Sequence, residues 1–209
     1  MKRNPPIFDF YFITDRTLTR QGVVEDVKAA LRAGVKVVQY REKELSLRAA
    51  YSTALEIARL CRQAEAYFIV NDRVDLALAV GADGVHLGPK DFPLEVVKRI
   101  APGLMVGVSA NTVEQALEFQ AKEADYVAAS PVFFTQTKAD LEEPGGVELV
   151  RSFARTLNIP FTAIGGIHLG NVDTVVTAGA RSVCAISATV GSEDVEESVR
   201  EFRRRLKVC

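Results

Sequence analysis

The chain has 209 residues, 48% of them hydrophobic, and its 26 Lys and Arg residues nearly balance its 27 Asp and Glu residues. The formal net charge of −1 at pH 7 excludes a general attraction to nucleic acid or to an anionic membrane surface, so an anionic ligand must be bound by local groups. The apolar content is enough for a full core, and we expect one domain over residues 1–209.

Short apolar runs alternate with helical stretches along the whole chain. We predict strands over residues 11–14, 35–40, 67–70, 84–87, 105–108, 126–129, 161–164 and 182–186. Between them, apolar residues recur at the i, i+3, i+4 spacing of amphipathic helices. The helix faces expected to be buried are Leu47, Tyr51, Ala54, Leu55, Ala58 and Cys61; Val113, Ala116, Leu117, Gln120 and Ala124; and Val195, Val199, Phe202 and Leu206.

The strands are apolar almost throughout, which is typical of a parallel sheet covered by helices. Eight βα pairs in a chain of this length predict an α/β fold, a single-domain (β/α)8 TIM barrel near its minimum size. An open doubly wound sheet is the alternative, but no GxGxxG follows the first strand, where the sequence reads TDRTLTRQG. Gly34, Gly81 and Gly179 each follow a helical stretch and are expected to end it in a left-handed conformation.

The cysteines and the N-terminal sequence give expectations about compartment. Cys61, Cys184 and Cys209 are odd in number and far apart, which argues against a disulfide framework and a zinc site, and we expect the first two to be buried thiols. Asp9 and Asp15 interrupt the first apolar run, and no run approaches the roughly 18 apolar residues of a membrane span. We expect a cytoplasmic protein without membrane contacts, and we leave homo-oligomerisation open.

In a barrel of this kind the active site is built at the carboxyl ends of the strands. The second strand leads into QYREK, where Gln39, Arg41 and Lys43 alternate and therefore share one side. An amide and two cations suit a polar, anionic ligand. Solvated charge at a strand end is the alternative explanation of the same pattern.

Two carboxylates follow the next two strands. Asn71 and Asp72 end the third strand, and Asp91 lies in the loop after the fourth. Mg²⁺ favours one or two carboxylates together with water and phosphate oxygens, so these residues predict a magnesium site that holds a phosphate group. Either aspartate could instead cap the helix that follows it.

The remaining strand ends carry hydroxyl groups, a lysine and glycines. Ser109 follows the fifth strand, and the long loop FFTQTKADLEEPGG after the sixth contains Thr135, Thr137 and Lys138, which could grip an anion. Gly165-Gly166 follow the seventh strand and Ile186-Ser187 lie at the end of the eighth, where these barrels usually bind phosphate.

Three other polar features have structural interpretations. His86 lies within the fourth strand and is expected to belong to a layer of side chains inside the barrel. His168 follows the Gly-Gly turn and is expected at the exposed start of a helix. The basic segment 200–207, REFRRRLK, is expected to be a solvated helix face.

The motifs VVQYREK, VNDRVDLALAVGADGVHLGPKD, GVSANT, SPVFFTQTKAD, IGGI and CAIS resemble, in this order, those of the thiamine-phosphate synthase family. The resemblance extends over nearly the whole chain. It implies a (β/α)8 transferase that couples 4-amino-2-methyl-5-hydroxymethylpyrimidine diphosphate with a thiazole phosphate and releases pyrophosphate. Mg²⁺ is the cofactor that the resemblance implies, and the two small-molecule substrates are the implied partners.

The resemblance also implies roles for individual residues. The pyrimidine diphosphate would be bound by Gln39, Arg41, Lys43, Asn71, Ser109 and Lys138. The thiazole phosphate would be bound by Thr135, Thr137, Gly166, Ile186 and Ser187. Mg²⁺ would be bound by Asp72 and Asp91, and the catalytic groups would be Arg41, Lys43, Ser109 and Lys138.

The sequence departs from the family's motifs at two positions, and three other functions remain as alternatives to the synthase. Asn111 stands where His is frequent, and Ser130 stands where Gly is usual. A related thiazole tautomerase would carry a catalytic His near the end of the sixth strand, and AASPVFFTQTK has none. A phosphosugar isomerase or lyase would need an acid or base, for which Glu42 is the candidate. A non-catalytic sensor would be expected to lose the groups that stabilise the leaving pyrophosphate.

Overall fold

The eight apolar runs form one parallel sheet whose strands follow one another in chain order. The computed structural model describes residues 9–135 and 143–206. Its strands are β1 (Tyr11–Ile13), β2 (Val37–Tyr40), β3 (Tyr67–Asn71), β4 (Gly84–Leu87), β5 (Met105–Ala110), β6 (Tyr126–Ala129), β7 (Phe161–Ile164) and β8 (Val183–Cys184). A parallel bridge between Phe10 and Val183 joins the two ends of the sheet, so the predicted barrel is confirmed and the open sheet is excluded.

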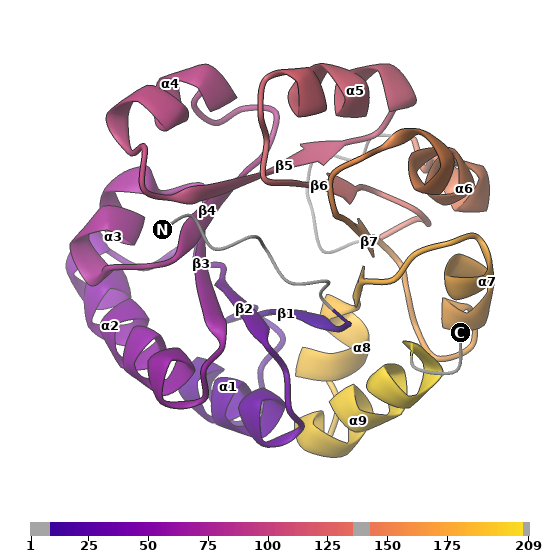
Figure 1. Cartoon of the computed structure of the whole chain (residues 1–209). Coiled ribbons are helices and arrows are strands. Elements are labelled where there is room, and N and C mark those ends of the chain that lie inside the picture. Colours follow the sequence, from indigo (N-terminus) through magenta and orange to yellow (C-terminus); the bar gives the residue numbers. More distant parts are fainter. Residues whose placement is uncertain (1–8, 136–142, 207–209) are drawn as a thin grey trace.

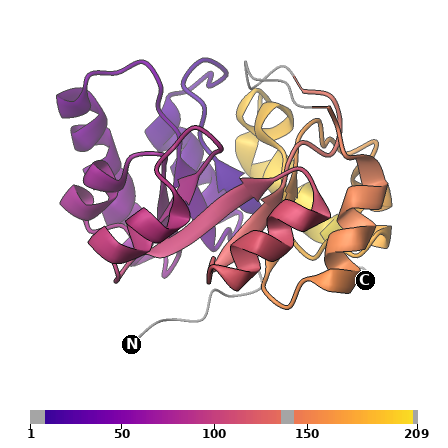
Figure 2. The same cartoon turned by 90° about the horizontal axis from the view of Figure 1, so that it is seen from above.

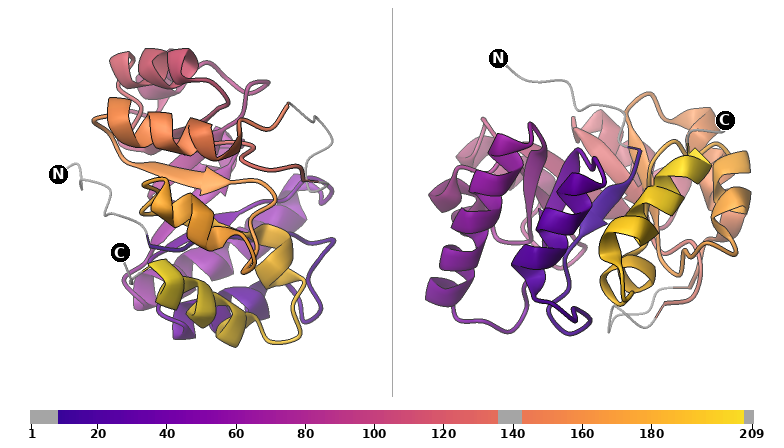
Figure 3. Two further views of the ribbon diagram at one scale, coloured as in Figure 1. Left: turned by 90° about the vertical axis from the view of Figure 1, so that its right-hand side faces the viewer. Right: turned by 90° about the horizontal axis from the view of Figure 1, so that it is seen from below.

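Helices surround the strands as an outer ring (Figure 1). They are α1 (Val23–Arg32), α2 (Leu47–Gln63), α3 (Val74–Val80), α4 (Leu94–Ile100), α5 (Val113–Ala121), α6 (Gly146–Thr156), α7 (Val172–Thr177), α8 (Ile186–Val190) and α9 (Val195–Leu206). Seen from above, the helices lie outside the strands on both sides of the molecule (Figure 2). The last helix, α9, packs beside α1 and closes the ring (Figure 3).

The core has two parts, one between the sheet and the helices and one inside the barrel. The side chains packed inside the barrel are Tyr11, Ile13, Val37, Ile69, Met105, Tyr126 and Cys184. Cys61 is buried in the outer part, so both predicted buried thiols are confirmed, whereas Cys209 lies outside the described residues. No helix in the described ranges is both long enough and apolar enough to cross a bilayer.

The predicted buried face of α2 is wrong at its larger residues. Ala54, Ala58 and Cys61 are buried as expected, but Leu47 and Leu55 are 48% and 46% exposed. The buried face of α2 is instead formed by Ala50, Ala54, Ile57, Ala58 and Cys61. It is rotated away from Leu47, Tyr51 and Leu55, which remain exposed.

The other two predicted helix faces differ in outcome. On α5, Ala116 is buried but Leu117 is exposed, so that face is only partly confirmed. The α9 face is confirmed, because Val195, Val199 and Phe202 are fully buried.

The ends of β8 and β5 and the glycines that end helices can be compared with the boundaries predicted from sequence. Strand β8 ends at Cys184, and Ile186 already belongs to α8, so the predicted strand over 182–186 is too long. Conversely, Ser109 lies within β5 and not after it. Gly81 is the left-handed C-cap of α3 with a φ of 64°, and Gly34 and Gly179 also have positive φ, as predicted.

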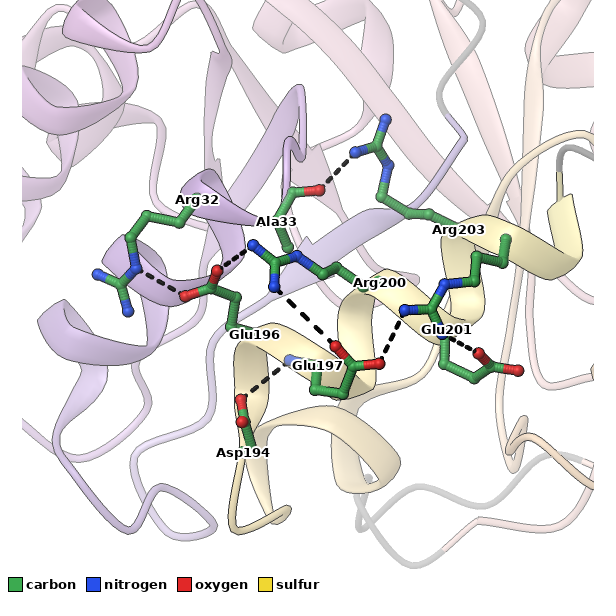
Figure 4. Close-up of polar contacts among 9 residues, drawn as sticks. Arg32, Ala33, Asp194, Glu196, Glu197, Arg200, Glu201 and Arg203 are labelled. Atoms are coloured by element: carbon green, nitrogen blue, oxygen red, sulfur yellow. Dashed lines mark hydrogen bonds and ion pairs between the residues drawn. The ribbon is translucent and has the colours of Figure 1, made fainter.

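The basic face of α9 is paired with carboxylates. Arg200 contacts Glu196 and Glu197 (Figure 4). Arg204 contacts Glu197 and Glu201, and all these separations are typical of one helix face. Within the described part of the segment, the expected solvated face is therefore an ion-paired surface; Lys207 lies outside the described residues. It offers little uncompensated positive charge to an anionic partner.

Arg203 has a different position and links three parts of the chain. Its guanidinium contacts the Asp9 carboxylate at 2.6 Å and donates to the Ala33 carbonyl, with 18% of the side chain exposed. Gly34 makes this approach feasible, because a Cβ there would lie 2.3 Å from Nη1 of Arg203. Arg203 therefore joins α9 to the end of α1 and to the segment that enters β1.

We predict that Arg203→Ala lowers the free energy of unfolding by about 2–3 kcal/mol, because it leaves the half-buried Asp9 carboxylate without its cation. Arg204→Ala is the matched control. Arg204 makes exposed ion pairs on the same helix, so its removal should cost less than about 1 kcal/mol. Urea denaturation measures both values, and equal losses in the two variants would contradict the assigned role of Arg203.

Asp26 of α1 gives a pH-dependent prediction. Neither of its carboxyl oxygens makes a hydrogen bond of good geometry among the described residues. Burial raises the pKa of this carboxyl, although the nearby Thr19 hydroxyl opposes the rise. A raised native pKa adds stability below the unfolded value of 3.8, and that stability is lost as the pH rises through the native pKa. Asp26→Asn should therefore raise the free energy of unfolding by on the order of 1 kcal/mol at about pH 7, and by much less at about pH 4.

The control for Asp26→Asn is Glu25→Gln. Glu25 is the neighbouring acidic residue of α1 and makes an exposed pair with Lys28. Its replacement should change stability by no more than about 0.5 kcal/mol. A stability gain for Asp26→Asn that does not grow between the two pH values would show that charge burial is not its cause.

Candidate functional site

A cleft of about 970 Å³ opens at the carboxyl ends of the strands. Every strand of the barrel contributes to its lining, through Tyr11, Gln39, Asn71, His86, Ser109, Ala128, Thr162 and Cys184. The loops that follow the strands form its walls. The closed barrel therefore brings side chains from all eight strands to one site.

The QYREK segment lies in the wall of the cleft, as its alternation predicted. Gln39 is buried within β2, and Arg41 and Lys43 line the cleft from the loop after it. Nη1 of Arg41 donates to Oδ2 of Asp15 at 2.6 Å, and Oδ1 of Asp15 accepts from the amide and hydroxyl of Thr17 at 2.9 and 2.6 Å. Asp15 thereby fixes the guanidinium at the cleft.

The sequence interpretation missed this role of Asp15. It follows β1 directly, so it is a carboxylate at a strand end, as Asp72 and Asp91 are. Its side chain is only 3% exposed, which makes it part of the site's interior and not a solvated loop residue. The signal available in the sequence was its position after YFIT.

Asp72 and Asp91 both line the cleft, and neither caps a helix. The N-cap position of α3 is Arg73 and that of α4 is Pro93. Asp72 contacts Nζ of Lys43 and has a φ of 61°, a left-handed conformation that aspartate adopts more readily than most residues. Oδ2 of Asp91 accepts from the Gly88 amide at 2.7 Å. The helix-cap explanation is therefore excluded for both carboxylates.

The electrostatics of this pair favour a cation. Burial and the neighbouring Asp72 carboxyl raise the pKa of Asp91 to about 6, although the Gly88 amide and Lys43 oppose the rise. Two carboxylates that share one place hold a proton more tightly than either alone, and a divalent cation can replace that proton. Within the described residues no cluster of three or more metal-binding side chains exists, so further ligands would come from water or substrate.

Asn71 and Ser109, like Gln39, line the cleft from the strands. Asn71 is the last residue of β3, and Ser109 points into the cleft from β5. Oγ of Ser109 lies 3.1 Å from Nε2 of His86. Both predicted residues are therefore brought beside the charged groups.

Four of the five residues predicted to bind the thiazole phosphate belong to the described part of the chain, and they lie in the same cleft. Thr135, Gly166, Ile186 and Ser187 all contribute to its lining. Thr137 and Lys138 lie outside the described residues. Of the three candidate loop residues, the structure therefore places Thr135 in the cleft, together with the Gly-Gly turn and the start of α8.

The Gly165-Gly166 turn is required by a close approach of two loops. Gly165 and Gly166 have φ values of 109° and 61°. A Cβ on Gly165 would lie 2.7 Å from Pro131, and one on Gly166 would lie 2.4 Å from the Phe134 carbonyl oxygen. Glycine at both positions therefore lets the loop after β6 lie against the end of β7, next to Thr135.

The histidines take the structural positions predicted for them. His86 lies inside the barrel, 3.0 Å from the Tyr126 hydroxyl. His168 is exposed and is not part of the cleft lining; its carbonyl accepts from the Val172 amide at the start of α7.

Glu42 and the two family departures have distinct positions. Glu42 lines the cleft, but its carboxylate accepts from the amides of Glu44 and Leu45, so it stabilises its own loop. Ser130 lines the cleft, whereas Asn111 does not.

Sequence comparison relates the chain to thiamine-phosphate synthases. Residues 10–189 match the family described as Thiamine monophosphate synthase. Thiamine-phosphate synthase of Pyrococcus abyssi is 43% identical over 194 residues, which cover 93% of this chain and 92% of that protein. Thiamine-phosphate synthase of Methanosarcina barkeri is 42% identical, over 93% of this chain and 88% of the relative.

Solved structures agree with the sequence comparison. Thiamine phosphate pyrophosphorylase from Pyrococcus furiosus superposes with a TM-score of 0.88 and 40% identity, over 97% of this chain and 96% of that one. A 3-hexulose-6-phosphate synthase, with a TM-score of 0.65 and 17% identity over 94% and 97% of the two chains, shares the fold alone. This chain belongs to the thiamine monophosphate synthase family.

Proposed function

We propose that the cleft binds an aminopyrimidine diphosphate beside a thiazole phosphate and performs the thiamine-phosphate synthase reaction of its family. The observation that carries this proposal is the convergence of Arg41 and Lys43 with the Asp72–Asp91 pair in one cleft. Cations beside a carboxylate pair suit a diphosphate, because the carboxylates hold a divalent ion and the cations contact phosphate oxygens.

In the proposed reaction the bond between the pyrimidine methylene carbon and the diphosphate oxygen breaks, and pyrophosphate takes the electron pair. The resulting cation is stabilised by the amino group of the pyrimidine ring. The thiazole nitrogen then donates its lone pair to the methylene carbon, which forms the new C–N bond. The site needs no protein nucleophile, because its tasks are to stabilise the leaving charge and to orient the two substrates.

The chain's own residues divide these tasks. Arg41 and Lys43 contact the departing pyrophosphate, and Gln39, Asn71 and Ser109 orient the pyrimidine. The thiazole phosphate is bound by Thr135, Thr137, Gly166, Ile186 and Ser187, with Lys138 directed at the pyrophosphate. Thr137 and Lys138 are assigned from the family resemblance alone, because they lie outside the described residues.

Mg²⁺ is the cofactor that we propose for the carboxylate pair. Asp72 and Asp91 would hold it, and when bound it would add positive charge next to the pyrophosphate. The raised pKa of Asp91 supports a cation at this pair. Within the described ranges no third His, Cys, Asp or Glu side chain joins the two carboxylates, so phosphate oxygens and water are the ligands that we propose for the remaining positions.

Asp15 is a positioning residue in this scheme. Its carboxylate holds the Arg41 guanidinium in one orientation and is itself held by Thr17. A pre-positioned guanidinium loses less conformational freedom when it binds phosphate oxygens.

The alternatives considered at the sequence level have less support. The described part of the loop after β6 contains no His for a tautomerase, and Glu42 is engaged with the amides of its own loop. Incubation with pyrimidine diphosphate, thiazole phosphate and Mg²⁺ should yield thiamine phosphate by mass spectrometry. Isomerisation of the thiazole without coupling would instead support the tautomerase.

We predict that Asp72→Asn and Asp91→Asn raise the Mg²⁺ concentration for half-maximal activity by at least about tenfold and lower kcat. In the wild-type protein this concentration should rise as the pH falls below about 6, because a proton then competes with the cation at Asp91. Asp75→Asn is the control, since Asp75 is an exposed partner of Arg73 outside the cleft lining. An unchanged Mg²⁺ dependence in both cleft variants would contradict the metal assignment.

We also predict that Asp15→Asn lowers kcat/KM for pyrimidine diphosphate by about 10- to 100-fold, the effect of losing one charge-assisted hydrogen bond in the transition state. The KM for thiazole phosphate should change little. Asp9→Asn is a matched control, because Asp9 also holds an arginine, Arg203, but outside the cleft lining. A uniform loss of activity and stability in both variants would assign Asp15 a purely structural role.

A further inference from the structure

Five polar side chains form one connected set of hydrogen bonds inside the barrel, which we call the interior relay. Nε2 of Gln39 donates to the Tyr11 hydroxyl at 2.8 Å, and the hydroxyls of Tyr11 and Tyr126 lie 2.7 Å apart. The Tyr126 hydroxyl lies 3.0 Å from Nδ1 of His86, and Nε2 of His86 lies 3.1 Å from Oγ of Ser109. The relay thus crosses the barrel from β2 to β5 and joins two residues assigned to the pyrimidine.

The relay is part of the packed core. The rings of Tyr11 and Tyr126 are fully buried, and burial raises the pKa of both phenols, so each keeps its hydrogen. Gly107, opposite His86 in the register of β4 and β5, provides the room. A Cβ on Gly107 would lie 1.9 Å from Cζ of Tyr126, so any side chain there would displace the phenol that contacts His86.

We propose that Tyr126 and His86 are positioning residues that direct the hydroxyl hydrogen of Ser109 into the cleft, where it selects a substrate carrying a hydrogen-bond acceptor such as a ring nitrogen. In the proposed order Gln39 donates to Tyr11, Tyr11 to Tyr126, Tyr126 to Nδ1 of His86, and Nε2–H of neutral His86 to Ser109. The Ser109 oxygen accepts one hydrogen and its own hydrogen is given to the ligand. The inference rests on the proposed function and names the substrate group that Ser109 recognises.

The direction of the relay decides which ligand fits. An amide nitrogen can only donate, which sets the direction at the Gln39 end. If the bonds from Tyr11 to Ser109 ran the other way, Ser109 would donate to His86 and offer only its oxygen, which suits an amino group. A site built to donate discriminates against an analogue that lacks the acceptor, because a buried donor is then left without a partner.

The test compares kcat/KM for the pyrimidine diphosphate with that for two analogues, in each of which one ring nitrogen is replaced by C–H. Thiazole phosphate and Mg²⁺ are held at saturation. The wild-type protein should prefer the natural substrate over one analogue by at least about 100-fold, as expected for a lost buried hydrogen bond. In Tyr126→Phe and His86→Leu this preference should fall at least about tenfold.

Two further variants separate positioning from general damage to the core. Ser182→Ala loses a buried hydrogen bond to Thr162 at 3.0 Å, outside the relay, and should keep the wild-type preference. His86→Gln places an amide nitrogen that can donate near the position of Nε2, so it should recover part of the preference lost in His86→Leu. Because the preference is a ratio within one variant, a smaller folded fraction does not alter it.

The outcomes distinguish the relay from the proposed function. A wild-type preference that persists in both His86→Leu and Tyr126→Phe overturns the relay, while product formation by the wild-type protein leaves the proposed function intact. Failure of the wild-type protein to form thiamine phosphate from the natural substrates overturns the proposed function itself.

Discussion

The site depends on the electrostatic relation between two carboxylates that lie together at the end of the barrel. Burial and the neighbouring Asp72 carboxyl both raise the cost of ionising Asp91. Lys43 contacts Asp72 and compensates part of the charge, while Arg41 is held nearby by Asp15. We interpret the whole cleft as a device that receives a divalent cation and a diphosphate together, because each compensates the charge of the other.

Closure of the barrel is what brings these groups together. Asp15, Arg41, Asp72 and Asp91 follow four successive strands, and the parallel order of the sheet delivers all of them to the same end. Closure also requires that the two end strands, β8 and β1, be joined. The bridge between Phe10 and Val183 and the packing of α9 against α1 join them. Different groups therefore stabilise the fold and form the site. Ion pairs on α9 and the buried core stabilise the ring, and residues at the strand ends form the proposed binding site.

Much of this arrangement could be predicted from sequence, because barrels place strand ends in one site whatever the details of packing. The site residues that sequence reasoning missed are those whose role depends on contacts between distant segments. Asp15 needed its partner Arg41, 26 positions away, and the Tyr11–Tyr126 contact joins residues 115 positions apart.

Local packing explains the remaining errors. On α2 the buried face includes Ala50 and Ile57 and excludes Leu47 and Leu55, because apolar residues lie on more than one side of the helix and their periodicity alone does not select the buried side. At β8 the chain turns into α8 directly after Cys184, although the residues that follow remain apolar.

The most direct test of this account is pyrophosphate release from the pyrimidine diphosphate, measured with and without thiazole phosphate and with and without Mg²⁺. The account predicts release that needs Mg²⁺ and is matched by an equal amount of thiamine phosphate when thiazole phosphate is present. Equal release with and without the cation would contradict the assignment of the carboxylate pair. Absence of release under all conditions, in a protein that still binds thiazole phosphate, would contradict the proposed reaction.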